Sequence, residues 1–185
     1  MDRLLHGHAV NPATPRGPRW AVPAYGVPVT TPATRLHLRL PLTDVGPAVE
    51  ELEPFGSPQE MAPLMLAAYR GTPDDEGESL EDTVEVLDGA VQGTFGPWLP
   101  EASFVVRDGG TPVGAVFTAL HGAEPYIAFV FTLPEATGRG VATRLITRVG
   151  QSLAGAGHEH VSLWVNVANE RAVRLYRHLG FVDVG

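Results

Sequence analysis

The clearest chemical pattern in this 185-residue chain lies close to its C-terminus. On a helix of about 3.6 residues per turn, Asn169, Ala172, Val173 and Tyr176 share one face. Asn169 and Tyr176 then lie two turns apart, roughly 10 Å along the axis. The preceding run, 160–165, is rich in β-branched and aromatic residues and is predicted to be a strand. A strand that leads into such a helix can grip an extended ligand and place a phenolic proton donor at its far end.

The same segment is also consistent with a helix that is only packed against a core. Tyr, Leu and Val at helical spacing are more often buried side chains than parts of a binding site. Asn169 is of a type favoured at helix starts, and Gly180 stands where a helix commonly ends. The helix is therefore predicted under both interpretations, and a second motif bears on the choice between them.

That second motif is a glycine-containing turn about thirty residues upstream. The apolar run 126–133 ends at Pro134, which stops a strand. The turn 137–140 then leads into a helix whose apolar residues recur on one face, at 141, 145, 146, 149 and 153. Glycines at such a turn let backbone N–H groups point into one concavity, where the helix N-terminus adds positive potential. The turn is suited to a pyrophosphate, but it lacks the Lys of a Walker A loop and the downstream acid of a dinucleotide fingerprint.

Together, in this order and spacing, the two motifs resemble those of the GCN5-related N-acetyltransferase (GNAT) family. Thr137-Gly-Arg-Gly140-Val-Ala142 is similar to the family's pyrophosphate loop, Gln/Arg-x-x-Gly-x-Gly/Ala, with Thr137 in place of the usual Gln or Arg. Asn169-x-x-Ala172-x-x-Leu175-Tyr176-x-x-x-Gly180-Phe181 matches the family's other signature at every named position. The resemblance covers about 35–184 and implies an α/β fold with a mixed sheet, that of the GNAT acyl-CoA N-acyltransferases.

The resemblance also implies an enzyme that moves an acetyl group from acetyl-CoA to a primary amine. Backbone N–H groups of the glycine turn would hold the pyrophosphate, and the strand before it would pair with the pantetheine arm. Tyr176 would protonate the departing thiolate, because a phenol of pKa near 10 is a usable acid toward a thiolate of pKa about 8.5 or higher. The implied coenzyme-binding residues are Val130, Phe131, Thr132, Thr137, Gly138, Arg139, Gly140, Val141, Ala142, Thr143 and Asn169.

The acceptor side of the reaction is less closely marked. Glu124, near His121 between two predicted strands, is our candidate general base, with a surface-loop role as the alternative. The loop 96–101 is a second candidate, since it precedes a core strand. Residues 74–88 hold eight acids and no base, a run that either attracts a cationic small molecule or peptide amine or is only a solvated helix face. A protein that binds acetyl-CoA without turnover is the competing function, because fold does not fix function.

The amino-acid composition excludes several classes of function and cofactor. The net charge of −8 argues against nucleic-acid binding, and the three arginines at 139, 144 and 148 are expected to serve the coenzyme's phosphates. The chain has no cysteine and no lysine, which excludes disulfides, a catalytic thiol and lysine self-acetylation. The seven histidines show no metal-ligand spacing, so no metal is expected. No apolar stretch could span a bilayer or serve as a secretory signal, so we expect a cytoplasmic protein without membrane contact, for which a homodimer stays open.

The chain divides into a Pro-rich arm, 1–33, expected to be extended or disordered, and one acetyltransferase domain, 34–185. The family's one or two strands after the last helix have little sequence left to form them. Either the sequence is truncated, or the segment 20–29 covers the open sheet edge. The domain's predicted strands are 35–40, 103–107, 113–120, 126–132 and 160–165, and its predicted helices are 57–69, 80–92, 140–154 and 169–179.

Overall fold

A computed structural model describes residues 35–185, so the arm 1–33 and the segment 20–29 lie outside the described residues. The described chain confirms the predicted α/β fold with a mixed sheet. In chain order its strands and α-helices are β1 (Arg35–Pro41), β2 (Glu53–Pro54), α1 (Pro58–Tyr69), α2 (Leu80–Val91), β3 (Phe104–Asp108), β4 (Thr111–His121), β5 (Glu124–Thr132), α3 (Val141–Gly155), β6 (His160–Asn166), α4 (Glu170–His178) and β7 (Val182–Asp183).

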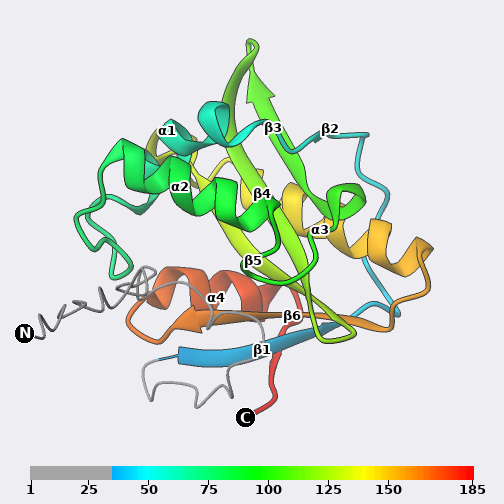
Figure 1. The fold of residues 1–185 in the computed structure, drawn as a ribbon. Coiled ribbons are helices and arrows are strands. Elements are labelled where there is room, and N and C mark those ends of the chain that lie inside the picture. The colour runs from blue at the N-terminus through cyan, green and yellow to red at the C-terminus, as the bar shows by residue number, and fades with distance from the viewer. Residues whose placement is uncertain (1–34) are drawn as a thin grey trace, which may run out of the picture.

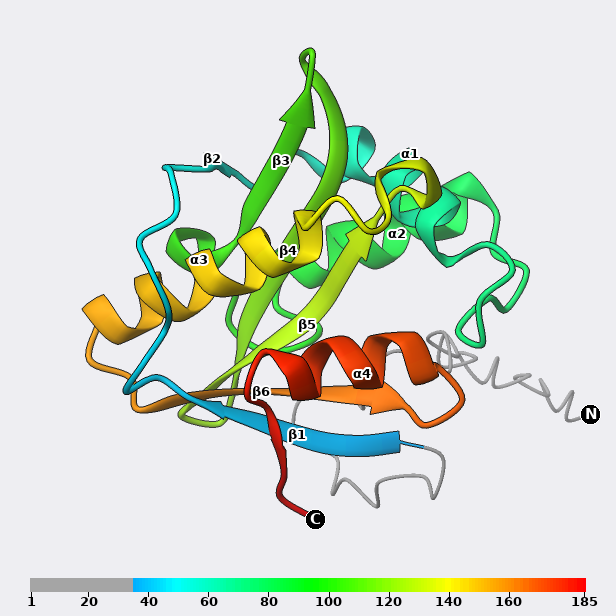
Figure 2. The same cartoon turned by 180° about the vertical axis from the view of Figure 1, so that it is seen from behind.

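The seven strands form one sheet in the order β2-β3-β4-β5-β6-β1-β7. Only the β5–β6 contact is parallel, and every other pairing is antiparallel. Helices α1 and α2 cover one face of the sheet, on β4 and β5 (Figure 1). Helices α3 and α4 lie on the opposite face, with α4 on β6 (Figure 2). Each face therefore has its own hydrophobic core.

Strand alternation explains how β1 and β6 serve both faces of the sheet. Leu36, Leu38 and Leu40 pair across from Val165, Leu163 and Val161, and these apolar residues face the core beneath α4. Directly opposite residues of antiparallel strands share a face. The alternate positions of the two strands, which include Arg35, His37 and Arg39 on β1 and Trp164 and Asn166 on β6, therefore look the other way.

Side-chain caps and one glycine define the ends of three helices. Ser57 caps α1, with Pro58 as the first helical residue. Ser79 and Asp82 form a reciprocal capping box at the start of α2. Asn169 caps α4, its side chain accepting a hydrogen bond from the Ala172 N–H. Gly180 follows α4 with φ of +95°, a conformation that L side chains rarely adopt.

Two short edge strands were missing from the sequence prediction. β7 follows α4 and pairs with Leu38 and Arg39 of β1, so the chain after the last helix adds a strand of two residues that carried no periodic signal. β2 pairs with β3 at the other edge. His121 and Glu124, placed by the sequence in a loop, are instead the paired ends of β4 and β5, because Gly122 at φ +64° permits a tight turn between them. Among the described helices, none is long and apolar enough to cross a membrane.

β5 and β6 meet at one point and then separate. Their registered pairing is Tyr126 with Ser162. Beyond it, β5 carries a bulge: Phe117 pairs with Phe129 and Thr118 with Ile127, which leaves Ala128 as the extra residue. A bulge bends its strand and increases the local twist. The two parallel strands therefore diverge toward their C-terminal ends, and the gap between them is where a ligand can enter the sheet.

We predict that Tyr126→Phe lowers the free energy of unfolding by about 1–3 kcal/mol, because it leaves a buried carbonyl without its donor. The Tyr126 hydroxyl donates to the Phe95 carbonyl at 2.5 Å, and its side chain is 1% exposed. Urea unfolding measures the change, and an unchanged m-value would show that the unfolded reference is the same. A loss below ~0.5 kcal/mol would mean that this bond contributes little where the strands meet.

Candidate active site

Two adjoining cavities open where β5 and β6 diverge. The smaller has a volume of about 110 Å³ and the larger about 570 Å³. Both are lined by Tyr69, Val130, Asn169, Ala172 and Tyr176. The structure thus brings together the strand and the helix face that the sequence analysis singled out, and adds the last residue of α1.

The smaller cavity reaches both faces of the sheet. Leu163 and Val165, which belong to the core beneath α4, line it together with Trp164 and Asn166, which point the opposite way. Arg35, the register partner of Asn166, lines it as well. A ligand on the α3–α4 side and a second ligand on the opposite side could therefore meet between the strands.

The glycine turn has the geometry that the sequence predicted for an anion site. Gly138 and Gly140 have φ of +76° and +77°. A Cβ at either position would meet no heavy atom within 4 Å, so the protein leaves the space beside the turn open. α3 begins after Gly140 with no side-chain cap and no acid in its first turn. In the described part of the chain, the N–H groups of Gly138, Gly140, Val141, Ala142 and Thr143 have no acceptor, which leaves them for an anionic ligand.

The larger cavity connects this turn to the rest of the site. It is lined by Val130, Phe131 and Thr132 on β5 and by Thr137 and Ala142 at the turn. On the other side it is bounded by α4 and the residues before it, from Ala168 to Tyr176. The edge of β5 that faces β6 has no registered strand partner after Tyr126, so its backbone can pair with an extended ligand.

Asn169 has two contacts of its own. Its Oδ1 accepts the capping hydrogen bond from Ala172 N at 3.2 Å. Its Nδ2 lies 3.5 Å from Oδ2 of Asp74, beyond the usual range for such a bond. The cap fixes the side chain at the mouth of both cavities and leaves the amide N–H groups able to donate to a ligand.

Tyr176 is 8% exposed and lies at the junction of the two cavities. Burial raises the pKa of its phenol well above the usual value, and the negative charge of Asp74 raises it further. Tyr69 also lines both cavities, and burial raises the pKa of its phenol as well. Tyr176 and Asp74 raise this pKa further. Both phenols therefore remain protonated at neutral pH, as a proton donor requires.

Three residues of the site were not assigned to it from the sequence. Tyr69 had the appearance of an ordinary apolar helix end, and Arg35 that of an alternating strand residue. Asp74 was noted only as one acid of the run 74–88. The structure joins Arg35 to Asp74 by an ion pair of 3.4 Å at the smaller cavity. No local signal marks such a pair, because its members are 39 residues apart.

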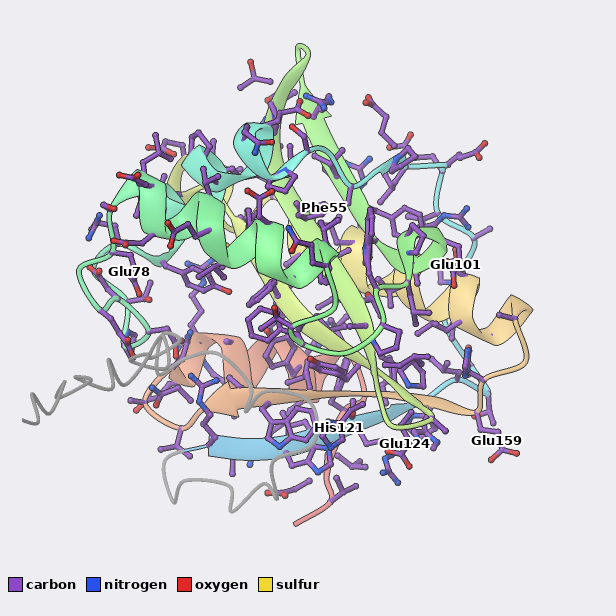
Figure 3. The ribbon with its side chains drawn as sticks, in the orientation of Figure 1. Phe55, Glu78, Glu101, His121, Glu124 and Glu159 are labelled. Atoms are coloured by element: carbon purple, nitrogen blue, oxygen red, sulfur yellow. The ribbon has the colours of Figure 1, made fainter. Side chains whose placement is uncertain are left out.

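The candidate general base, Glu124, lies elsewhere. It pairs with Arg39 at 3.0 Å and with His160 at 3.4 Å, and it lines neither cavity. His121 packs edge-on against Trp164 beside it. Figure 3 shows both residues at the β4–β5 turn, far from Glu78 in the α1–α2 connection. The structure therefore places Glu124 at the first residue of β5, in contact with Arg39 and His160 and outside the lining of both cavities.

The loop proposed for the acceptor side and the arginines expected to bind the phosphates each contact other parts of the protein. In the loop 96–101, Trp98 donates to Ser103 and stacks on Phe117, so this loop packs against the sheet. Of the three arginines expected to serve the phosphates, Arg144 pairs with Glu50 and Arg148 lies over the Phe104 ring. Arg139 remains at the glycine turn, in an exposed pair with Asp108 at 3.0 Å.

The acids of the run 74–88 differ in their surroundings. Asp75 bonds to the Gly71 and Gly77 N–H groups and to Arg70, contacts that hold its pKa below the usual value. Asp82 belongs to the capping box of α2. Of the described acids in this run, Asp74 is the one that lines either of the two cavities of the site. No group of three potential ligands for a metal ion occurs in the range 35–185.

Comparison with known proteins agrees with this geometry. Residues 69–181 match the model of the acetyltransferase (GNAT) family. A mycothiol acetyltransferase of Thermobispora bispora is 32% identical in an alignment of 175 residues that covers 85% of this chain and 57% of that protein. The N-alpha-acetyltransferase MAK3 of Arabidopsis thaliana is 31% identical in an alignment of 87 residues that covers 45% of this chain and 46% of that protein. The chain thus spans about half the length of these curated relatives.

Solved structures show the same fold. A GCN5-related N-acetyltransferase from Sphaerobacter thermophilus superposes with a TM-score of 0.63 at 20% identity, over 81% of this chain and 48% of that one. An aminoglycoside N-acetyltransferase in complex with CoA superposes with a TM-score of 0.54 at 17% identity, over 73% and 89% of the two chains. The family model covers most of the described residues, including the glycine turn and the helix from Asn169 to Tyr176. This chain therefore belongs to the GNAT family of acetyltransferases.

Proposed function

We propose that this protein transfers an acetyl group from acetyl-CoA to a primary amine, with Tyr176 as the general acid. The observation that carries the proposal is the position of Tyr176. This buried, protonated phenol lies where the cavity along the glycine turn meets the cavity that reaches the opposite face of the sheet. A protein that only binds the coenzyme has no need for a proton donor at this junction, so the arrangement favours turnover over the competing role of a sensor or scaffold.

The residues along the larger cavity fit the coenzyme. The free N–H groups of Gly138 and of residues 140–143 would hold the pyrophosphate at the start of α3. The strand residues Val130, Phe131 and Thr132 would pair with the pantetheine arm, and the Asn169 amide would donate to it. Arg139 could exchange its exposed carboxylate partner, Asp108, for a phosphate. Thr137, in place of the family's Gln or Arg, would add little beyond its backbone.

The chemistry then needs three proton movements. The ammonium form of the acceptor first loses a proton to water, and the free amine attacks the thioester carbonyl carbon. The carbon–sulfur bond breaks as the departing thiolate takes the phenolic proton of Tyr176. The nitrogen gives up a second proton to water as the amide forms, and water returns one proton to the Tyr176 phenolate.

The acceptor is proposed to be a small-molecule or peptide amine. The names of the relatives point to both kinds, since they include a mycothiol acetyltransferase, an N-alpha-acetyltransferase and an aminoglycoside N-acetyltransferase. An acetyl-transfer screen over polyamines, aminoglycosides, amino acids and peptide N-termini tests the proposal. Coenzyme binding without transfer to any of these amines would favour the sensor or scaffold.

Acetyl-CoA should raise the melting temperature of the protein, because a ligand that binds only the folded state stabilises it. Gly140→Val should abolish that shift, since a side chain there blocks approach to the backbone N–H groups. Gly122→Val is the matched control: Gly122 also has a positive φ, +64°, and open space beside it, but lies in the β4–β5 turn. Equal shifts in the two variants would place the phosphate site elsewhere.

Tyr176→Phe should lower kcat by ~10²-fold or more while the dissociation constant for acetyl-CoA changes little. Tyr69→Phe removes the other phenol of the same cavities and serves as the comparison. Steady-state kinetics and a coenzyme titration measure both quantities. A larger kcat loss in Tyr69→Phe would transfer the role of acid to Tyr69, and equal loss of kcat and affinity would make Tyr176 structural.

The pH dependence of kcat should show the raised pKa of Tyr176. An acid is active only while protonated, so the activity it supports is present below its pKa and lost above it. Because burial moves this pKa upward from about 10, kcat should not fall on the alkaline side before about pH 10. The profile is measured with the rate of non-enzymatic thioester hydrolysis subtracted at each pH. A decline centred between pH 8 and 9 would contradict the assignment.

A further inference from the structure

Asp74 is a carboxylate at the reaction site with no role in the scheme above. Among the described residues it is the only acid that lines the smaller cavity. Glu170, at the larger cavity, is 79% exposed on its side chain and paired with Arg174. The Asp74 side chain is only 13% exposed and lies close enough to Tyr176 to affect its phenol.

The hydrogen bonds of this carboxylate are weak for a group so far from water. Arg35 Nη2 approaches Oδ1 at 3.4 Å, and Asn169 Nδ2 approaches Oδ2 at 3.5 Å. Good N–H···O bonds measure 2.7–3.2 Å, and charge-assisted ones are shorter still. An ionised carboxylate can accept about four such bonds. Within residues 35–185, Asp74 therefore keeps unused accepting capacity at a cavity that it lines, where a ligand with several N–H donors would satisfy it.

The position of Asp74 does not depend on its own side chain. Thr72 Oγ1 accepts from the Asp74 N–H at 3.2 Å, and Asp75 accepts from Gly71 N at 2.7 Å. Asn166 Nδ2 reaches the Pro73 carbonyl at 3.4 Å and ties the loop to the end of β6. The α1–α2 connection is thus folded by neighbouring bonds, which leave the Asp74 carboxylate able to change partners.

We propose that Asp74 binds the acceptor amine, which displaces Arg35 from this carboxylate. The inference rests on the proposed acetyl transfer and names its acceptor class: a slender primary alkylamine, whose ammonium offers three donors. Such a group would enter from the face of the sheet that carries Arg35 and Asn166, opposite the glycine turn. Asp74 would then hold the nitrogen beside Tyr176 until its proton passes to water.

The test compares Asp74→Asn with Glu81→Gln, which removes the same charge from an exposed position on α2 in the same acidic run. Spermidine, kanamycin A and tyramine are the acceptors, each assayed at 0.01 M and 0.5 M NaCl. Asp74→Asn should lower kcat/KM by ~10- to 100-fold through a higher KM for the amine. Glu81→Gln should not, and Asp74→Glu, which keeps the charge, should recover part of the loss.

Salt separates contact from long-range attraction. The Debye length falls from ~30 Å at 0.01 M to below ~8 Å at 0.5 M, so steering by the whole acidic run would fade while a direct contact would persist. A loss in Asp74→Asn that remains at 0.5 M NaCl supports the proposal. A loss shared with Glu81→Gln and removed by salt, or kcat/KM within twofold of the unaltered protein, overturns it.

A binding measurement keeps this inference distinct from the proposed function. With coenzyme A present, spermidine should raise the melting temperature of the unaltered protein but not of Asp74→Asn. The acetyl-CoA shift, retained in Asp74→Asn, shows that this variant is folded. If no amine is acetylated yet the spermidine shift still requires Asp74, the amine site stands and the transferase activity does not. If neither turnover nor the shift depends on Asp74, the amine site is refuted.

Discussion

The site depends on how briefly β5 and β6 pair. One registered pair, Tyr126 with Ser162, joins two parallel strands, and the bulge at Ala128 then turns β5 away. Had the ladder continued, its hydrogen bonds would have satisfied the edge of β5 and closed the sheet. The Tyr126 hydroxyl, bonded to the Phe95 carbonyl, fastens β5 on its α2 side at the point of divergence. The backbone of β5 and β6 thus creates the gap, and the side chains that line it determine which ligands fit.

The two ends of this gap are charged differently. The glycine turn offers unpaired N–H groups and a helix N-terminus, which favour an anion. The opposite face offers Arg35 and Asp74, which neutralise each other in a protein of net charge −8. Under the proposed function, an anionic coenzyme would therefore enter at the glycine turn, and an amine would meet the Asp74 carboxylate at the opposite face. Selection of the acceptor would then rest on contact more than on attraction at a distance.

Sequence alone predicted the parts of the site that are local. Asn169 and Tyr176 are seven residues apart on one helix, and Gly138 and Gly140 need positive φ within one turn, so spacing was sufficient. The longer helices and strands were likewise predictable from hydrophobic periodicity and from residues typical of helix ends. By contrast, the approach of Asn169 to Asp74 joins residues that are 95 positions apart in the sequence. It depends on where the α1–α2 connection packs, which no local pattern indicates. Glu124 was chosen for its nearness to core strands, yet its charge is taken up by Arg39, 85 residues away. β2 and β7, with two residues each, are too short for any period to appear.

Those two strands have a consequence for how copies of the protein meet. A long, flat edge strand would template pairing with another chain, and natural sheets avoid this with short edges, charge and proline. Both edges of the described sheet use these devices: β2 is Glu53–Pro54 and β7 is Val182–Asp183, and all four residues are exposed. Pairing of another chain directly onto β2 or β7 is therefore disfavoured. The opening between β5 and β6 lies in the interior of the strand order, so contacts made at either of these edge strands would leave it accessible.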